Sequence, residues 1–292
     1  MATTALGSKT RSPLDLALGL TLLDLLLQPV GDWRLRFPIL ALAAAGMLFP
    51  DLLRRVELWT GLTALVSLRV ALDWPLPDNH AYLLSYWCLA VAISRVDSDP
   101  DRGLAISARW LIVGVFGFAT FWKLVLSPDF AQSTFFHATL LQDPRFEDFT
   151  RLLGGLTYEQ IDAARNALDR HVDGHSLPAL AATTPSARFA LLARGLTLWT
   201  LAIEFSISLA FAWPSGRGPS RLRDVMLILF CTTTYAVAPV PGFGWLLIAM
   251  GLAQCTTSRP TTRVAYLATF AWILFCREVN WIGFLADLLE TP

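Results

Sequence analysis

The chain has 292 residues, of which 54% are hydrophobic and 16% are charged, and its formal net charge is zero. Soluble domains usually carry about a quarter charged residues, so this composition excludes an ordinary soluble protein and predicts a polytopic, all-α membrane protein. The mean hydropathy is +0.51 and the pI is near 6.9. We therefore expect the lipid bilayer, and no nucleic acid, among its partners.

Nine apolar stretches have roughly the length of a transmembrane helix, which needs about 20 mostly apolar residues. Prolines such as Pro50, Pro214 and Pro260 separate them. The first stretch contains Asp15 and Asp24, and we expect it to be a retained helix rather than a removed signal peptide. The nine predicted helices cover residues 14–30, 36–50, 57–74, 80–95, 108–126, 190–213, 223–239, 242–256 and 262–277.

The short loops predict the orientation, because Lys and Arg favour the cytoplasmic side. With the N-terminal tail (residues 1–13) in the cytoplasm, most basic residues fall on that side, and Arg34, Arg36 and Arg277 are the exceptions. The C-terminal segment, residues 278–292, then lies outside. A bacterial inner membrane suits such compact loops. The cytoplasmic basic residues are Lys9, Arg11, Arg54, Arg55, Arg95, Arg102, Arg109, Arg217, Arg221, Arg223, Arg259 and Arg263.

Residues 127–189 are predicted to form an exoplasmic helical cap between the first five membrane helices (residues 14–126) and the last four (residues 190–277). Thr157 and Gln160 have the spacing of a capping box that opens an amphipathic helix, and Gly174 ends it. The preceding part of the cap is rich in phenylalanine and leucine. We expect that part to lie along the membrane surface or to cap the helical bundle.

Ionisable side chains within the apolar stretches are candidate functional residues, because a charge at bilayer depth costs about 2.5–3.5 kcal/mol. Arg69 and Asp73 are spaced to pair on one helix face, either as a structural pair or as part of a site. His80 lies at the start of the fourth predicted helix. Asp78 and Asn79 before it suit a helix N-cap, which leaves the imidazole without an assigned role.

Lys123 and Glu204 are the two other candidates. Lys123 lies beside Trp122 near the exoplasmic end of the fifth predicted helix. It is either an interfacial lysine that snorkels to the membrane surface or a partly desolvated amine that acts as a general base. Glu204 lies midway along the sixth predicted helix and needs a partner, which Arg69 or Lys123 could supply.

The histidines and cysteines give no clear metal site. His171 and His175 have the spacing of a helical zinc pair, but Gly174 argues against a continuous helix, so we favour solvated loop histidines and expect no metal. His137 lies among phenylalanines and is expected to pack. The cysteines lie within apolar runs without ligand spacing, which indicates buried small side chains. They are Cys88, Cys231, Cys255 and Cys276.

Three segments together resemble the horizontally transferred transmembrane domain family, which includes the vitamin K-dependent γ-glutamyl carboxylase. DNHAYLLSYWCLAVAI (78–93) is similar to that family's Asn-His-Tyr-Leu stretch. VFGFATFWKLVLSPDF (115–130) is similar to its Ala-Gly-X-X-Lys-Leu segment, and LWTLAIEFSISLAFAWP with the helices that follow (198–256) resembles its later membrane core. The resemblance covers roughly residues 14–256.

The resemblance implies a quinone-dependent, carboxylase-like enzyme. In that family, oxidation of a reduced quinone yields an alkoxide-like product that removes a proton from the substrate glutamate before carbon dioxide adds, and a lysine deprotonates the hydroquinone. Lys123 has the position of that lysine, so the resemblance makes Lys123, His80 and Glu204 the expected catalytic residues. Asn79, Trp122 and Arg69 are expected to bind the reduced quinone. The predicted orientation puts His80 and Lys123 on the same, exoplasmic side.

Three departures from the family pattern limit this expectation. The family's Phe-His pair is replaced by FCTTTY (230–235), with Cys231 in place of the histidine, and an Ala-Gly pair has become Ala119–Thr120. Full carboxylases carry a large extramembranous region after the membrane core, whereas only a short segment follows the last predicted helix here. We therefore do not expect carboxylation of a peptide substrate.

Three functions stay open at this point. As an enzyme, the protein would admit a quinone or another lipid-like small molecule to Lys123 through a lateral opening. As a non-catalytic scaffold or accessory subunit, it would bind other membrane protein subunits through its cap, with small residues such as Gly114 and Gly117 at helix contacts. A transporter is least favoured, because the sequence shows no matching pair of broken helices.

Overall fold

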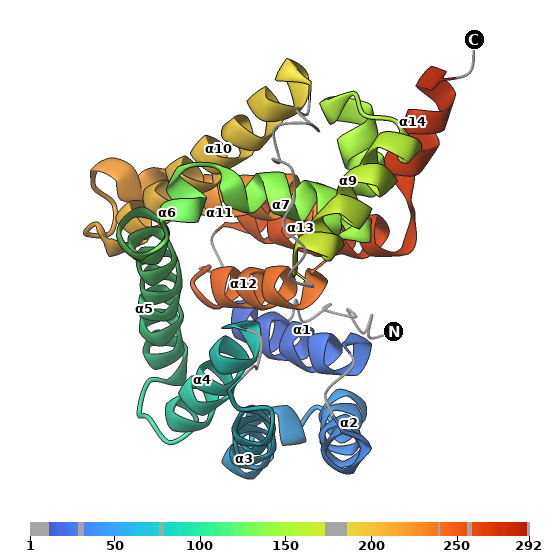
Figure 1. Cartoon of the computed structure of the whole chain (residues 1–292). Coiled ribbons are helices and arrows are strands. Elements are labelled where there is room, and N and C mark those ends of the chain that lie inside the picture. The colour runs from blue at the N-terminus through green and yellow to red at the C-terminus, as the bar shows by residue number, and fades with distance from the viewer. Residues whose placement is uncertain are drawn as a thin grey trace, which may run out of the picture. The chain divides into compact units, whose positions relative to one another are not determined.

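The computed structural model describes residues 12–28, 32–75, 79–172, 186–238, 240–255 and 259–290. In these residues the chain forms helices and helical turns and no strand, which confirms the predicted all-α fold (Figure 1). The chain divides into two compact units. Unit 1 comprises Met1–Ile112 with Gly242–Phe270, and unit 2 comprises Val113–Pro241 with Ala271–Pro292.

Each of the nine predicted apolar stretches coincides with a helix. The largest difference is at α5, which begins at Pro100 instead of residue 108. The earlier start follows from local capping, because the Asp99 carboxylate accepts a hydrogen bond from the Arg102 backbone N–H at 3.2 Å. The helices are α1 (Pro13–Leu27), α2 (Trp33–Leu48), α3 (Val56–Leu72), α4 (Asn79–Ser94), α5 (Pro100–Phe121), α10 (Ala187–Ala212), α11 (Arg223–Val237), α12 (Pro241–Ala253) and α13 (Pro260–Glu278).

Two of the described helices are long and apolar enough to cross a membrane. They are Pro100–Leu126, which is α5 with the π-helical turn η2 (Trp122–Leu126), and α10. Several others are shorter: α11 has 15 residues and α12 has 13. At about 1.5 Å per residue these reach only about 20–23 Å, less than the hydrocarbon thickness of about 30 Å. Length and composition thus mark two of the described helices as candidate membrane spans, and the nine-span arrangement stays a prediction.

The core of unit 1 is built around α12, which is apolar on all sides and buried on all sides. Trp245 is fully buried, stacks on Phe270 with ring centroids 5.1 Å apart, and donates its indole N–H to the Phe270 carbonyl at 3.3 Å. In the same unit α3 and α4 pack on each other, and the hydroxyls of Ser67 and Ser85 lie 2.6 Å apart. Polar side chains thus join helices that are otherwise apolar.

Close packing around α12 leads to a prediction for Gly251. A Cβ atom at Gly251 would lie 2.6 Å from ring carbons of Tyr266, whose side chain is fully buried. We expect Gly251→Ala to destabilise the protein by about 1–2 kcal/mol, because the ring cannot move away without disturbing its neighbours. Gly19→Ala in α1 is the matched control, since its Cβ would meet no atom within 4 Å. Equal denaturation midpoints for the two variants would contradict this packing.

Ion pairs and hydrogen bonds also hold α1 and α3. Asp15 pairs with Arg54, in the short 3-10 helix η1 (Leu52–Arg54), at 2.8 Å. Arg69 and Asp73 pair at 3.3 Å, as their spacing predicts. The other carboxylate of α1, Asp24, is buried and has no ion pair among the described residues.

Unit 2 joins short helices of the predicted cap to the long helix α10. Its core holds Leu140, Leu141, Phe149, Leu156, Ile161, Ala164, Phe189, Ala193 and Ile282. Leu140 and Leu141 are buried with Phe189 of α10, so the phenylalanine-rich segment packs on a long helix. The elements are α6 (Pro128–Ala131), α7 (Thr134–Gln142), η3 (Pro144–Phe146), α8 (Glu147–Phe149), η4 (Thr150–Gly154), α9 (Tyr158–Val172), η6 (Gly218–Leu222) and α14 (Trp281–Glu290).

The predicted capping box at the start of α9 is confirmed. The Gln160 side chain accepts a hydrogen bond from the Thr157 backbone N–H at 2.9 Å, and the Thr157 hydroxyl accepts one from the Gln160 N–H at 3.3 Å. Gly174 and His175 lie outside the described residues, as does the side chain of His171. The zinc and loop interpretations of these histidines therefore stay untested.

A C-terminal helix that the sequence analysis did not predict, α14, packs against the cap helices (Figure 1). Asn280, just before α14, donates a hydrogen bond to Asp148 at 2.8 Å. Arg151 is buried, with 4% of its side chain exposed, and pairs with Asp148 at 3.2 Å and with Asp287 of α14 at 3.6 Å. Arg151 also donates to the Tyr158 hydroxyl. One buried arginine thus links three segments of unit 2.

Candidate functional site

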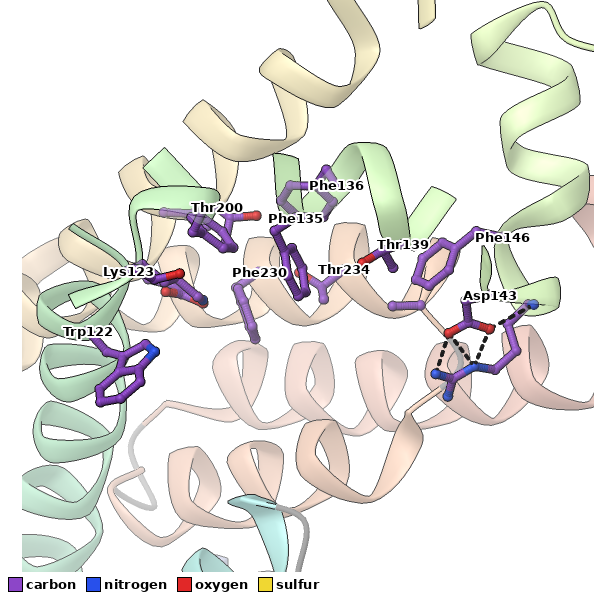
Figure 2. A pocket seen from close by; sticks show the side chains of 16 residues that line it. Trp122, Lys123, Phe135, Phe136, Thr139, Asp143, Phe146, Thr200, Phe230 and Thr234 are labelled. Atoms are coloured by element: carbon purple, nitrogen blue, oxygen red, sulfur yellow. Dashed lines mark hydrogen bonds and ion pairs between the residues drawn. The ribbon is translucent and has the colours of Figure 1, made fainter. Parts of the chain in front are cut away.

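A pocket of about 460 Å³ in unit 2 contains the Lys123 and Glu204 side chains (Figure 2). Ligand pockets for small molecules typically measure about 300–1,000 Å³, so this one can hold a compact organic molecule. Its lining residues come from η2, α6, α7, η3, α10 and α11. They are Trp122, Lys123, Ser127, Phe130, Phe135, Phe136, Thr139, Asp143, Arg145, Phe146, Thr200, Ile203, Glu204, Phe230, Thr234 and Ala238.

Local backbone irregularity positions Lys123. The α5 helix continues into the π-helical turn η2, and Pro128 ends that turn because it forces Ser127 out of helical geometry. Single π turns inside helices are often found at functional sites. The chain then forms α6, whose Phe130 lies with its ring centroid 5.1 Å from the Lys123 ammonium. The end of α5 and the turn after it thus place a lysine against an aromatic ring.

Glu204 meets Lys123 from the middle of α10. Its Oε1 accepts a hydrogen bond from the Lys123 Nζ, and the two side chains are 9% and 21% exposed, so the ion pair is largely buried. The sequence suggested Arg69 or Lys123 as the partner of Glu204, and Glu204 pairs with Lys123. The second carboxylate oxygen, Oε2, is buried and has no hydrogen-bond partner among the described residues. A buried acceptor without a donor is costly, so this oxygen is available for a ligand.

Aromatic side chains form the walls of the pocket. The rings of Phe130, Phe135 and Phe136 pack on one another with centroids 5.3–5.5 Å apart. Phe230 of α11 lines the pocket next to Thr234, one helical turn later. In Figure 2 the labelled phenylalanines lie between Lys123 and Asp143. The middle of the pocket therefore suits an apolar, ring-containing molecule.

A second charged pair, Asp143 with Arg145, lines the pocket at the other end of the view in Figure 2. The Asp143 carboxylate accepts hydrogen bonds from the Arg145 guanidinium at 2.5–3.0 Å, and these bonds lower the pKa of Asp143. Each pair on the pocket wall is thus internally neutral. Thr139, Thr200 and Thr234 add hydroxyl groups to the pocket wall. The pocket offers hydrogen bonds without net charge.

His137 lies on α7 near the pocket but does not line it. Its imidazole packs edge-on against Phe189, with ring centroids 5.2 Å apart, which confirms the predicted packing role. Burial lowers the pKa of His137 below its ordinary value of 6.5. The neutral imidazole is therefore the form that the folded protein prefers.

This burial predicts a pH dependence of stability. Below pH 6.5 the unfolded chain takes up a proton at His137 that the folded protein does not, so the free energy of unfolding should fall as the pH drops through that value. His137→Phe removes this proton uptake. Denaturation at pH 7 and pH 5 should show a smaller pH-dependent loss in His137→Phe than in the unaltered protein. The same loss in both would show that His137 titrates normally.

The structure brings three of the six predicted site residues together. Lys123, Glu204 and Trp122 all line the pocket in unit 2. His80 and Asn79 open α4, and Arg69 lies in the last turn of α3; all three belong to unit 1, and their part in the site stays a prediction. Cys231, which replaces the histidine of the family pattern, is buried and free. Among the described residues no group of three His, Cys, Asp or Glu side chains could hold a metal ion.

Sequence reasoning missed the residues that complete the pocket. It expected the segment with Phe135, Phe136 and Phe146 to lie along the membrane surface or to cap the bundle, and it gave them no part in a site, whereas they line the pocket. It gave no role to the Asp143–Arg145 pair. The sequence signal for that pair is Asp143 followed by Pro144, a pattern typical of a helix start. Asp143 caps η3, because its carboxylate accepts a hydrogen bond from the Arg145 backbone N–H at 3.0 Å.

The geometry allows proton transfer to and from a bound molecule. The free Glu204 oxygen can accept a proton from a ligand hydroxyl, and the Lys123 ammonium can stabilise an oxygen that becomes negative. A proton can also pass between Lys123 and Glu204 along their shared hydrogen bond.

Comparisons of the chain with protein-family models, with curated proteins and with solved structures found no match.

Proposed function

We propose that this chain is a multi-pass membrane protein of the horizontally transferred transmembrane domain type, whose pocket at Lys123 and Glu204 binds a reduced quinone or a similar neutral, lipid-soluble molecule. The observation that carries the proposal is the buried Lys123–Glu204 pair, with one unpartnered carboxylate oxygen, at a pocket walled by phenylalanines. The pair would act as the acid–base centre of a redox-coupled reaction. The roles expected for His80, Asn79 and Arg69 stay predictions from the sequence.

The distribution of apolar side chains supports the membrane part of this proposal. The apolar windows of Pro100–Leu126 and α10 are only 28% and 33% buried, whereas a core helix of a soluble protein is mostly buried. Phe118 on α5 is 79% exposed, and Leu191 and Phe205 on α10 are 71% and 56% exposed. Large apolar residues in such numbers at a surface need lipid or another protein to cover them. Nine spans, a cytoplasmic N-terminus and a bacterial inner membrane are part of the proposal.

The neutrality of the pocket supports a quinone-like ligand. Both ion pairs on its wall are self-neutralised, so an ion would gain little there, whereas a neutral ring with oxygen substituents could use the hydroxyls and the free Glu204 oxygen. A hydroquinone hydroxyl would donate to Glu204 Oε2, and its proton would leave the ligand by that route. In the family pattern a neutral lysine takes this proton. Here the Glu204 carboxylate would take it, and the Lys123 ammonium would stabilise the resulting hydroquinone anion.

A binding titration tests the proposal. Reduced 1,4-naphthoquinone is titrated under argon into the purified protein in lipid nanodiscs, and the heat of binding is measured. We expect saturable binding that weakens at least tenfold in Thr234→Trp, because an indole at this pocket-lining position would fill space that the ligand needs. Val225→Trp is the matched control, since Val225 is 57% exposed on the same helix and outside the pocket.

The titration also separates the two candidate functions. Saturable binding that Lys123→Ala abolishes and Val225→Trp retains would support a redox enzyme site. Absence of saturable binding, or binding that Thr234→Trp leaves unchanged, would reject the pocket as the quinone site. The alternative, a non-catalytic scaffold or accessory subunit, would then be favoured by stable co-purification of another membrane protein.

A further inference from the structure

In unit 1, Asp24 of α1 is a buried carboxyl group without an ion pair among the described residues. Asp24 is 3% exposed, and its Oδ1 has no hydrogen-bond partner among the described residues. Asp15, on the same helix, is compensated by Arg54 at 2.8 Å. One helix thus carries one paired and one unpaired carboxyl group.

The neighbours of Asp24 explain why its Oδ1 has no donor. Thr21, one turn earlier, donates its hydroxyl hydrogen to the Ala17 carbonyl at 2.9 Å and accepts the Trp87 indole N–H at 2.9 Å, so it has no hydrogen left for Asp24. Gln28, one turn later, has a buried Nε2 that also lacks a partner. Gln28 is the C-cap residue of α1, four residues after Asp24, so two buried polar atoms without partners lie close together in the chain.

The charged and titratable groups on the elements packed against α1 do not neutralise Asp24. From α4 the Cys88 thiol lies within electrostatic range of its carboxyl group. From η1, Arg54 is taken up by Asp15, which lies nine residues, or about 13 Å, along the helix. Arg34 and Arg36 of α2 are exposed. From α12, which begins beside Gln28 at Gly242, the sequence PGFGWLLIAMGLA brings no titratable side chain.

We propose that Asp24 is a proton-binding site of unit 1, which carries its carboxyl group in the neutral, protonated form at pH 7. Burying an unpaired carboxylate costs several kcal/mol, and one bound proton removes the charge that causes this cost. A neutral acid can both donate and accept a hydrogen bond, so a water molecule could join it to the Gln28 amide. This site is independent of the pocket at Lys123, because it uses none of the same residues.

Infrared difference spectroscopy on the full chain tests the proposal. The spectrum of the unaltered protein minus that of Asp24→Asn should contain the carbonyl band of one protonated carboxylic acid at pH 7, and the band should shift in heavy water. Asp15→Asn is the matched control from the same helix, and its difference spectrum should contain carboxylate bands instead. If Asp24→Asn does not fold, Asp24→Glu keeps the acid and should move the band rather than remove it.

The outcomes are distinct. A protonated-acid band that is lost in Asp24→Asn, or moved in Asp24→Glu, supports the site. Carboxylate bands in the Asp24 difference spectrum at pH 7 would overturn it, whatever the result of the quinone titration.

Discussion

Replacing Lys123 alone by methionine should destabilise the protein by about 3–5 kcal/mol, the usual cost of removing one partner of a buried ion pair. The loss arises because Glu204, only 9% exposed, would then be left buried with neither oxygen paired. Chemical denaturation of the purified protein, followed by circular dichroism, would measure it. Lys9→Met changes the only other lysine of the chain and is the matched control.

The double variant Lys123→Met with Glu204→Gln separates the ion pair from the shape of the site. It removes both charges and keeps both side-chain lengths, so most of the stability lost in Lys123→Met should return. If the double variant were as unstable as the single one, the packing of the lysine stem and not its charge would be what matters. If Lys123→Met itself were as stable as the unaltered protein, Glu204 would not be buried against it.

Arg151→Met is the second large expected effect, a loss of about 3 kcal/mol, because it breaks a mostly buried ion pair with Asp148. The variant also removes the contact with Asp287 on α14 and the hydrogen bond to Tyr158. Hydrogen exchange measured by mass spectrometry should speed up in α14 more than in α10, since α14 loses a direct tie. Arg151 is thus expected to hold the C-terminal helix.

Arg145→Met is the control for Arg151→Met. Arg145 also pairs with an aspartate, but 53% of its side chain is exposed. Pairs of this kind contribute about 0–1 kcal/mol, so this variant should be close to the unaltered protein in stability. Equal losses in the two arginine variants would contradict the difference in burial.

The helices could be predicted from the sequence because their signals are local. Runs of apolar residues bounded by proline gave the nine stretches, and each coincides with a helix. The capping box at Thr157 and the Arg69–Asp73 pair also depend on residues three or four positions apart. The start of α5 was placed too late, because its first turns carry charges and are fixed by a cap at Asp99.

The pocket was predicted only in part, because it depends on contacts between distant segments. Lys123 and Glu204 were singled out as costly charges in apolar stretches, and the lysine was conspicuous as one of two lysines among 23 basic residues. Their pairing joins residues 81 positions apart, which no periodicity encodes. The segment with Phe135 and Phe136 was expected along the membrane surface or over the bundle, because an apolar helix face has the same sequence pattern whether it contacts lipid or lines a pocket.

The helix α14 escaped prediction for a similar reason. Its ten residues are too few to span a membrane. Its stability comes from contacts with Arg151 and Asp148, and the Asn280–Asp148 hydrogen bond joins residues more than 130 positions apart. Short helices are marginal alone and depend on tertiary contacts.

Photolabelling tests the central claim most directly. A naphthoquinone carrying a diazirine is reduced, irradiated with the protein in nanodiscs, and the modified residues are located by mass spectrometry. We predict labels on pocket residues such as Phe135, Phe136 and Phe230, lost in Thr234→Trp and retained in Val225→Trp. Labels that lie elsewhere, or that persist unchanged in Thr234→Trp, would contradict a quinone site at Lys123 and Glu204.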